Sequence, residues 1–422
     1  GMTIPITNNG LGYNNLIFIS LLLAKMQVDS DGRYLGSNAK VFPILLIEEP
    51  EAHLHPTMQF QFLKFLKDNL ENKKVRQVFV TSHSTHITSS AQLDDLICLY
   101  RDDSGIHVSY PGKVFINIEL ENGEPKIKEK NESKKYVQRF LDATKSNMLF
   151  AEKIIFVEGM AEQLLIPVFA QYLGKNLEEN HVSVINVGGR YFHHFLYLFD
   201  STRTNTINRK VVCITDLDPM RQKKDDKNEG DSKEDKKNKK DNNDKKFKKC
   251  YPYEFGLENE IYEYTKNTSL QSYENNQHPN IQAFTQDHNY GKTLEYQIAF
   301  ENPECKLLLT PSLKNRDEIE QIINSFSEPL ERLFQILRKS EENDRICSSL
   351  NKELVSHVWS ESKKKAALIA SRYLNSVGKG ENALELSSIL QENFLKNGAE
   401  DFQEFHVPKY IEDAIEWVCD DK

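Results

Sequence analysis

Two pairs of carboxylates follow apolar runs of the sequence that are rich in β-branched residues. The first run, residues 153–157, leads into Glu158, and Glu162 comes four residues later, where we expect the first turn of a helix. A second run ends before Asp216 and Asp218, which lie on the same side of the chain if it is extended. Because ligands collect at the carboxyl ends of the strands in a parallel sheet, we expect all four side chains in one crevice.

These carboxylates have the chemistry of a metal-dependent phosphodiesterase. Their hard oxygens suit Mg²⁺ or Mn²⁺ rather than Zn²⁺, and two such ions about 4 Å apart could clamp the attacking and leaving oxygens of an in-line cleavage. We expect Glu162, Asp216 and Asp218 to hold the ions. We expect Glu158 either to bridge a metal or to act as general base on the attacking water. The alternative is an acidic surface, which would not place every carboxylate at a strand end or a first helical turn.

A second set of residues suits nucleotide binding. The string LLIEEPEAHLHP, residues 45–56, joins an apolar strand to Glu48 and Glu49. One of these carboxylates can orient the water shell of a magnesium ion, and the other can polarise a water for attack on a γ-phosphate. A later strand ends in the string TSHS at residues 81–84, where His83 could touch the same phosphate.

The opening string NNGLGYNN, residues 8–15, also suits a phosphate group. Gly10 and Gly12 let the backbone approach the phosphate, and the helix that follows, with Asn14 at its start, would direct a positive N-terminus toward it. No G-x-x-x-x-G-K-[ST] loop occurs in the sequence. We therefore expect this chain alone to hydrolyse ATP poorly.

Alternating strand and helix patterns must position these residues. The strand–helix rhythm from residue 153 predicts a parallel sheet, whereas the turn signal Pro111-Gly112 predicts that the strands within residues 96–120 pair as a meander. From residue 316 onward the pattern is mostly helical. Strands are expected at residues 41–47, 75–80, 96–100, 106–110, 114–120, 153–157, 181–187 and 210–215, and helices at residues 16–27, 56–69, 134–141, 161–173 and 191–199.

The composition indicates a large cytoplasmic protein with two or three domains. The 422 residues have a net charge of −9, so any contact with DNA must be local or run through metal ions. No apolar run reaches about 18 residues, which argues against a membrane span, and the six cysteines contain no CxxC pair, which argues against a disulfide scaffold or a zinc site. Residues 221–249 hold 13 Lys and Arg against 8 Asp and Glu, and we expect a disordered insertion there that could contact DNA.

These motifs together resemble a known family. The pattern from Glu158 to Glu162 followed by Asp216-x-Asp218 is similar to a Toprim domain. The N-terminal strings resemble the signature, Walker B, D-loop and H-loop of ABC-type ATPases, in which His53 and His55 would be D-loop residues rather than a metal pair. The combination resembles the OLD (overcoming lysogenization defect) nuclease family over most of residues 8–422.

The resemblance implies a fold and further site residues. The fold would be α/β, with a partial ABC-type ATPase sheet in residues 1–130, a Rossmann-like Toprim domain in residues 131–315 and a helical C-terminal region in residues 316–422. Glu295, in the string KTLEYQIA, would be a further metal ligand, with a solvated helix residue as the alternative. Lys379, in the string GKGENALELSSIL, would stabilise negative charge at the scissile phosphate, in competition with the lysines at residues 363–365.

The expected function is that of a metal-dependent DNA endonuclease regulated by ATP in the full-length protein. Its cofactors would be Mg²⁺ or Mn²⁺ and ATP, and its partners DNA, a second copy in a homodimer or larger homo-oligomer, and a helicase-like or other defence-system protein. Phage defence and DNA repair are both open as roles. Gly1-Met2 resembles a tag remnant, which predicts a C-terminal fragment, although a natural short protein with a decayed ATPase half is the alternative. The rival functions are an ATP-dependent DNA-binding or clamp protein with a structural Toprim domain, and a primase or strand-passing enzyme.

Overall fold

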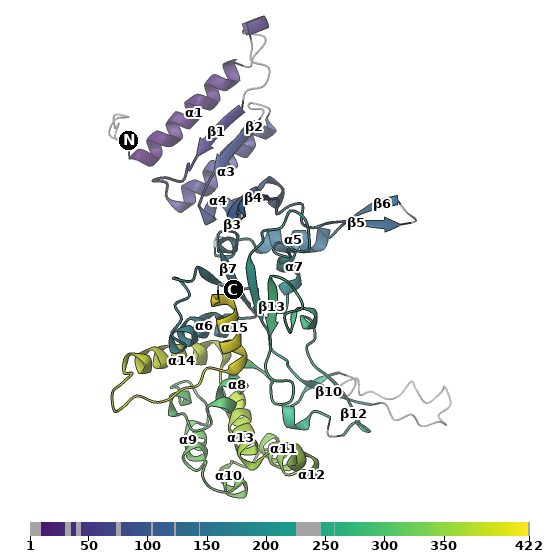
Figure 1. The fold of residues 1–422 in the computed structure, drawn as a ribbon. Helices are drawn as coiled ribbons and strands as arrows, with labels where there is room; N and C mark the ends of the chain where they lie inside the picture. Colours follow the sequence, from purple (N-terminus) through teal and green to yellow (C-terminus); the bar gives the residue numbers. More distant parts are fainter. Residues whose placement is uncertain are drawn as a thin grey trace, which may run out of the picture. The chain divides into compact units, whose positions relative to one another are not determined.

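A computed structural model describes residues 10–29, 35–38, 44–72, 77–102, 104–121, 124–142, 144–224, 246–256 and 258–420 (Figure 1). The chain forms two compact units. The first consists of Gly1–Ala151 and His193–Asn208, and the second consists of Glu152–Phe192 and Arg209–Lys422. The architecture is mixed α/β, as the sequence predicts.

The first unit begins with a small α/β layer. Strands β1 (Ile44–Glu48) and β2 (Gln77–Thr81) pair in parallel, and helices α1 (Leu11–Asp29) and α3 (Pro56–Glu71) pack on one face of them. Alternate residues of β1 are buried, as expected for a strand with one covered face. The core of this layer consists of Ile19, Leu23, Leu45, Ile47, Phe62 and Leu66.

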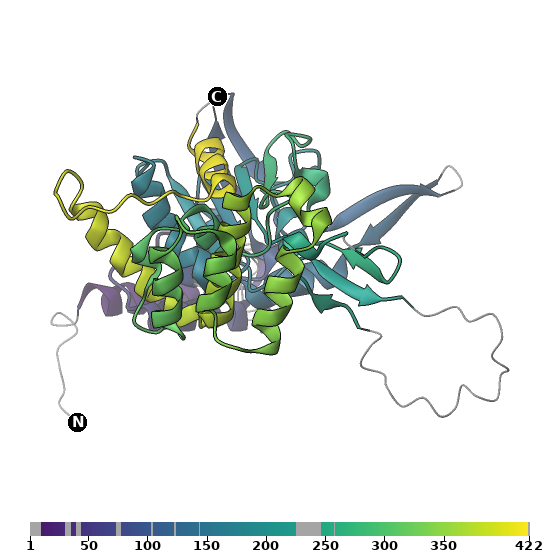
Figure 2. The same cartoon turned by 90° about the horizontal axis from the view of Figure 1, so that it is seen from below.

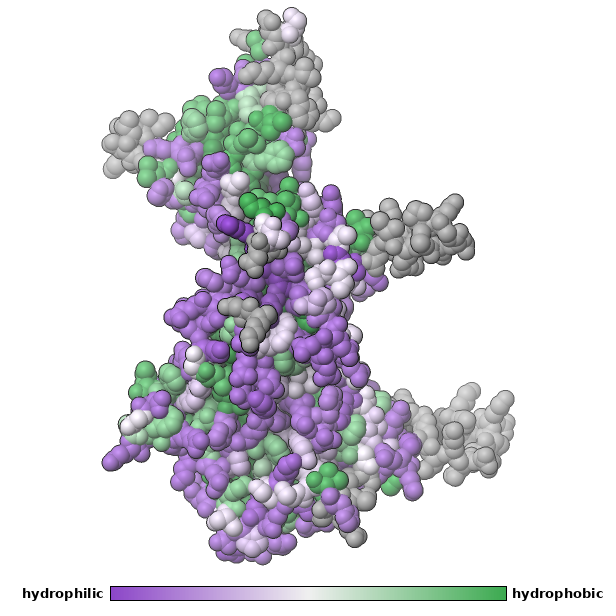
Figure 3. Space-filling model, viewed as in Figure 1, coloured by the Kyte–Doolittle hydropathy of each residue, from purple (hydrophilic) through white to green (hydrophobic). Residues whose placement is uncertain are grey.

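The other face of this sheet is apolar and exposed. Leu46 is 71% exposed, Ile44 51% and Phe79 44%. Figure 3 shows the resulting hydrophobic area in green where β1 and β2 lie. Helix α1 is also largely exposed, and its 19 residues are long and apolar enough to cross a membrane by length and composition alone. The expectation from the sequence that no segment passes this test is therefore wrong, although α1 packs Ile19 and Leu23 into the core of the layer.

Two hairpins and three short helices complete the described part of the first unit. Strand β3 (Cys98–Asp102) pairs with β4 (Gly105–Ser109), and β5 (Ile116–Glu121) pairs with β6 (Glu124–Glu129). The remaining helices are α4 (Thr85–Ser90), α5 (Asn131–Phe140) and α7 (Phe192–Leu196), and α7 begins with the last residue of a second-unit segment.

The expected meander is wrong, because in the described part of the chain β4 and β5 belong to separate two-stranded sheets. The segment between them bonds instead to residues that lie far along the sequence. The Tyr110 amide donates to the Asn205 carbonyl at 3.0 Å, and the Arg203 guanidinium donates to the Val114 carbonyl at 2.8 Å. These long-range partners, which local turn signals cannot reveal, take the backbone groups that a meander would use.

A four-stranded parallel sheet forms the centre of the second unit. Its order is β13-β9-β7-β8, with β7 at Lys153–Val157, β8 at Val182–Asn186, β9 at Lys210–Ile214 and β13 at Ile281–Phe284. Val157 lies opposite both Ile214 and Asn186, so the carboxyl ends of β7, β8 and β9 are level with one another. The predicted parallel sheet is confirmed, and β13 is an additional strand.

Helices cover this sheet and extend the second unit. Helix α6 (Met160–Tyr172) packs against α14 (Lys379–Leu395), α8 (Leu294–Glu301) packs against α13 (Glu361–Ser376), and α15 (Lys409–Cys419) packs on β9 and β13. Figure 2 shows the C-terminal helices, green to yellow, gathered in one body. The remaining helices are α9 (Arg316–Asn324), α10 (Leu330–Ile336), α11 (Glu341–Leu350) and α12 (Glu353–Val358).

A small antiparallel sheet contains both ends of the segment that was expected to be disordered. Strand β10 (Met220–Lys223) lies between β11 (Lys248–Lys249) and β12 (Tyr262–Thr265). The expectation of disorder is therefore wrong for these ends, while residues 225–245 lie outside the described part of the chain. Arg221 anchors β10, because its guanidinium lies 4.7 Å from the centre of the Tyr262 ring and 3.5 Å from the buried Glu254 carboxylate.

Candidate functional site

The predicted carboxylates gather at the carboxyl edge of the four-stranded sheet. Glu158 directly follows β7, and Glu162 is buried in the first turn of α6. Asp216 and Asp218 follow β9, and Glu295 is buried in the first turn of α8. The structure thus brings together acidic residues that lie up to 137 positions apart in the sequence, since Glu158 and Glu295 both face Asp216.

Electrostatic repulsion shows how close these groups are. Burial raises the pKa of Asp216 well above its ordinary value, and the charges of Glu162, Glu295, Glu158 and Asp218 raise it further. A carboxylate with a raised pKa beside other carboxylates is typical of a functional site, because a fold gains no stability from such repulsion.

Hydrogen bonds hold the strand-end residues in place. The amide of Asp216 donates to Glu158 Oε1 at 3.1 Å, and the Thr215 hydroxyl donates to the same oxygen. The Gln286 side chain donates to Asp216 Oδ1 at 2.6 Å and accepts from the Leu217 amide at 2.9 Å. Gln286 follows β13, the strand that sequence patterns did not predict, so its role was missed as well.

Two more residues missed from the sequence fix the loop after β9. The Asn267 side chain donates to the Asp216 carbonyl at 2.8 Å, and the Asp218 amide donates to the Lys292 carbonyl at 3.0 Å. Asp218 adopts a left-handed backbone with φ 42°. Lys292 is buried, its ammonium donates to the Cys250 carbonyl at 2.5 Å, and burial lowers its pKa to about 8. In the sequence, the one feature that points to Lys292 is its position in the same string as Thr293 and Glu295.

Two cations touch the acidic cluster. The Arg190 guanidinium bonds to Asp218 Oδ2 and lies 3.8 Å from Glu158 Oε2, and the Lys249 ammonium lies 3.6 Å from Asp218 Oδ1. Arg190 follows β8 and Lys249 ends β11, so each cation comes from a different element. Sequence reasoning noted the glycines at residues 188–189 but not the arginine after them.

The donor set fits a hard divalent cation. Asp218 Oδ1 and Glu295 Oε2 are buried oxygens without a hydrogen-bond donor, which a cation would satisfy. Within the described ranges, no three His, Cys, Asp or Glu side chains are already arranged as a metal-binding group. Arg190 bridges two of the carboxylates in this arrangement. The residues that would hold an ion are Glu158, Glu162, Asp216, Asp218 and Glu295.

Lys379 begins helix α14, and its side chain lies outside the described part of the structure. Two of its competitors are engaged elsewhere. Lys363 lies over the Tyr290 ring at 3.7 Å, and Lys365 donates to the Phe326 carbonyl at 3.2 Å. The role of Lys379 therefore stays a prediction.

The acidic residues after β11 serve other partners. Glu254 is buried and accepts two hydrogen bonds from Arg345, at 2.6 and 2.8 Å, while Glu258 pairs with Lys352 at 2.6 Å. These contacts join the small β10–β12 sheet to helices of the same unit. Glu254 and Glu258 therefore act as structural ion-pair residues.

In the first unit, the two strand-end motifs lie side by side. Glu48 ends β1, and the Glu49 amide donates to the Thr81 carbonyl at the end of β2, at 3.0 Å. The His83 imidazole lies 3.5 Å from the Glu49 carboxylate, and both side chains are exposed. The predicted neighbourhood of Glu49 and His83 is present, with both groups open to a ligand.

Glu51 positions this motif and was missed from the sequence. Its carboxylate accepts from the Ser82 hydroxyl and from the His83 amide, each at 2.8 Å. The His55 Nδ1 contacts the Thr57 hydroxyl at 2.7 Å, and the side chain caps the start of α3.

The glycines of the opening string have different surroundings. Gly12 is buried in the first turn of α1, where a Cβ atom would lie 2.4 Å from the His53 carbonyl oxygen, whereas a Cβ on Gly10 would meet open space. Asn14 donates its amide to the Gly10 carbonyl at 3.2 Å. Gly12 therefore allows close packing between the start of α1 and the loop after β1, while residues 8 and 9 lie outside the described ranges.

We expect Gly12→Ala to loosen α1, and Gly10→Ala to leave it unchanged, because only the first adds a methyl group against the backbone. Limited proteolysis would measure the change as faster cleavage within residues 11–29 of the Gly12→Ala protein. Equal cleavage rates in the two variants would contradict the close packing.

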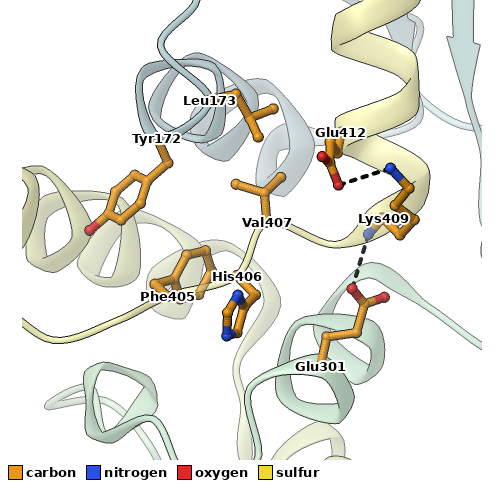
Figure 4. A pocket seen from close by; sticks show the side chains of 8 residues that line it. All are labelled: Tyr172, Leu173, Glu301, Phe405, His406, Val407, Lys409 and Glu412. Atoms are coloured by element: carbon orange, nitrogen blue, oxygen red, sulfur yellow. Dashed lines mark hydrogen bonds and ion pairs between the residues drawn. The ribbon is translucent and has the colours of Figure 1, made fainter.

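A cavity of about 480 Å³ lies apart from the carboxylates in the second unit (Figure 4). Glu301 accepts from the Lys409 amide at 3.0 Å, and the Lys409 ammonium lies 3.2 Å from Glu412. The Lys409 ammonium is therefore paired with a carboxylate of the lining, while Glu301 is held by a backbone amide. Its lining residues are Tyr172, Leu173, Glu301, Phe405, His406, Val407, Lys409 and Glu412.

Two segments match known protein families. Residues 1–88 match an AAA ATPase domain, and residues 149–218 match the TOPRIM domain of overcoming lysogenization defect protein-like proteins. The second match contains Glu158, Glu162, Asp216 and Asp218.

Relatives of known name share part of the chain. Endonuclease GajA of Bacillus cereus (strain HuB5-5) is 28% identical over 243 residues, which cover 54% of this chain and 33% of the relative. OLD nuclease of Thermus scotoductus is 24% identical over 45% of this chain and 32% of the relative. The matched part thus amounts to about a third of the length of these proteins.

The structure is also weakly similar to the C-terminal region of the OLD protein of Xanthomonas campestris pv. campestris. That likeness covers 64% of this chain and 94% of the other, with 15% identity and a TM-score of 0.30, which is too low to bear on function. The family matches and the named relatives together identify the chain as a relative of the OLD proteins, with an AAA ATPase segment followed by an OLD-like TOPRIM domain.

Proposed function

We propose that the second unit contains a metal-dependent DNA endonuclease site, regulated by ATP in the full-length protein. The observation that supports it best is the convergence of four carboxylates on Asp216 at the carboxyl edge of a parallel sheet. The names of the relatives, endonuclease GajA and OLD nuclease, agree with this chemistry.

Each residue has a distinct task in this proposal. A bound pair of Mg²⁺ or Mn²⁺ ions would supply the Lewis acid and activate the attacking water. Glu162, Asp216, Asp218 and Glu295 hold the ions, and the Gln286 amide keeps the Asp216 carboxylate oriented through its 2.6 Å hydrogen bond.

Glu158 is fixed by the Thr215 hydroxyl and the Asp216 amide through Oε1, which leaves Oε2 to face the water or an ion. Lys379 would neutralise charge on the phosphate. Because carboxylates repel a polyanion, the site binds DNA only after metal has entered.

The experiment is cleavage of supercoiled plasmid by this chain with Mg²⁺, Mn²⁺ or EDTA, each with and without ATP. We expect metal-dependent nicking that the Glu158→Ala/Asp216→Ala protein lacks, because the variant loses the base and a central ligand. The matched control is Asp401→Asn, which changes an exposed carboxylate in the same unit and should cleave like the parent. Nicking by the double variant at the rate of the parent would reject the site and favour a DNA-binding or clamp protein.

The ATP site, the oligomeric state, the location in the cell and the protein partners are proposals as well. Glu49, His83 and the glycines at residues 10 and 12 would take part in ATP binding when two copies of the ATPase segment meet, so the working protein would be a homodimer or larger homo-oligomer. It would act in the cytoplasm in phage defence or DNA repair, with a helicase-like or other defence-system protein as a further partner. The support is the exposed position of Glu49 and His83 within the segment that matches an AAA ATPase domain.

A further inference from the structure

The loop after β8 places a cation over the acidic cluster. It runs through Gly188 and Gly189, whose φ angles of 76° and 130° suit glycine far better than other residues. The Gly188 amide donates to the Asn186 side chain at 2.8 Å, so the start of the loop is fixed to the end of the strand. Arg190 comes next, at the carboxyl edge where the ends of β7 and β9 also lie.

Arg190 connects two carboxylates that come from different strands. Its Nη2 bonds to Asp218 Oδ2, and its Nε lies 3.8 Å from Glu158 Oε2. The two acidic side chains are 15% and 18% exposed, so the pairs are shielded more than an ordinary surface ion pair. The Arg190 side chain is 38% exposed, so its guanidinium has a path toward solvent.

This contact uses the oxygens that a metal ion needs. Glu158 and Asp218 are two of the five carboxylates proposed as ligands, and a guanidinium and a divalent ion cannot both occupy the space between them. Among the described side chains, the five acidic groups outnumber Arg190, Lys249 and the buried Lys292, whose charge interacts with Asp218, so the cluster retains negative charge that attracts a divalent ion. Arg190 therefore has the position of a counter-ion that metal replaces.

We propose that Arg190 is an exchangeable counter-ion of the metal site. Without metal it holds Glu158 and Asp218, and when a divalent ion binds it is displaced and contacts a phosphate oxygen of the DNA. The displacement follows from the geometry of the cluster, whereas the contact with DNA rests on the proposed endonuclease function. A guanidinium suits that second task because its planar set of donors matches phosphate oxygens.

The first test is calorimetric titration of the metal-free chain with Mn²⁺, in the absence of DNA. We expect Arg190→Ala to bind Mn²⁺ about fivefold more tightly than the parent, because the ion no longer displaces a partly shielded ion pair. Arg190→Lys should lie between the two. Weaker or unchanged binding by Arg190→Ala would overturn the proposal, since a residue that merely orients the ligands would lower the affinity when removed.

Two control variants separate this effect from a general change of charge. Arg332→Ala removes an arginine on α10 that bonds to Gln335, and it should leave Mn²⁺ affinity unchanged. Lys249→Ala removes the more exposed cation, which contacts one oxygen at 3.6 Å, and its effect should be smaller than that of Arg190→Ala. If Arg190→Ala, Arg332→Ala and Lys249→Ala all gained the same Mn²⁺ affinity, the gain would be explained by the change in net charge. That result would reject the specific role of Arg190.

The second test measures the contact with DNA. With Ca²⁺ in place of a catalytic ion, Arg190→Ala should bind a short duplex more weakly, and the dependence of its affinity on salt should be less steep by about one ion. Tighter Mn²⁺ binding together with unchanged duplex binding would overturn the phosphate contact and keep the counter-ion role. The absence of any plasmid cleavage by the parent would reject the endonuclease function, while the Mn²⁺ titration would still decide the counter-ion role.

Discussion

Replacing Asp216 with asparagine should abolish metal-dependent cleavage and at the same time stabilise the metal-free protein. Asparagine keeps the oxygen that accepts from Gln286 but removes the charge that four neighbouring carboxylates oppose. Loss of a hydrogen-bond partner of a metal ligand lowers activity about 10- to 100-fold, so loss of the ligand charge itself should cost on the order of 100-fold or more. Plasmid cleavage and thermal unfolding in EDTA would measure the two effects.

The pH dependence of the stability effect follows from the raised pKa of Asp216. The Asp216 carboxylate binds a proton more tightly in the folded chain than in the unfolded chain. The charged form of Asp216 therefore destabilises the fold at neutral pH. The penalty is complete above the folded pKa and absent below the ordinary value of 3.8. The advantage of Asp216→Asn should therefore be absent below about pH 4 and should grow as the pH rises toward the raised pKa of Asp216 in the folded chain, while Asp401→Asn should show no such trend. A variant less stable than the parent at pH 7 in EDTA would contradict the repulsion.

Replacing Arg372 with methionine should destabilise the second unit strongly. The Arg372 guanidinium on α13 bonds to Glu318 on α9 at 2.6 and 2.8 Å, and the two side chains are 8% and 2% exposed. Removal of the arginine leaves a buried carboxylate with the Arg338 amide at 3.1 Å and its guanidinium at 3.6 Å. Breaking a buried ion pair in this way costs about 3–5 kcal/mol.

Denaturant unfolding followed by tryptophan fluorescence would measure this loss, because the two tryptophans of the sequence, Trp359 and Trp417, both lie in the second unit. The double variant Arg372→Met/Glu318→Leu should recover most of the stability, since it also removes the buried carboxylate that has lost its closest partner. Lys396→Met breaks an exposed pair with Asp401 and should change the free energy of unfolding far less than Arg372→Met does, because solvent screens the pair. If Arg372→Met and Lys396→Met lowered the free energy of unfolding equally, burial would not increase the contribution of the Arg372–Glu318 pair to stability.

Local sequence patterns were sufficient for the elements that are buried on both faces. The run at residues 153–157 has four fully buried residues in β7, and a strand of that kind in a parallel sheet reads as a continuous apolar segment. Because strand and helix alternate there, the carboxylates after each strand could be assigned to one edge before their distances were known. Glu158, Glu162, Asp216 and Asp218 lie there as predicted.

Other features depend on contacts that no local pattern contains. Strand β13 has four residues and follows a polar stretch, so neither it nor Gln286 was predicted. Arg190 follows two glycines and belongs to none of the motifs identified in the sequence. The β3–β6 region lost its predicted meander because its backbone bonds to residues 203–205, about 90 positions away. Local sequence patterns cannot predict pairings between residues that lie this far apart in the sequence.

The division into two units gives the polypeptide three covalent crossings, at residues 151–152, 192–193 and 208–209. Two of these crossings are the ends of the segment His193–Asn208, which belongs to the first unit and lies between β8 and β9 in the sequence. One leaves two residues after Arg190, and the other returns just before the strand that leads to Asp216. The backbone therefore leads from the first unit directly to the carboxylate edge of the second. For the same reason, a single cut between the units cannot free an intact second unit, because residues 193–208 would remain attached without the core on which they pack.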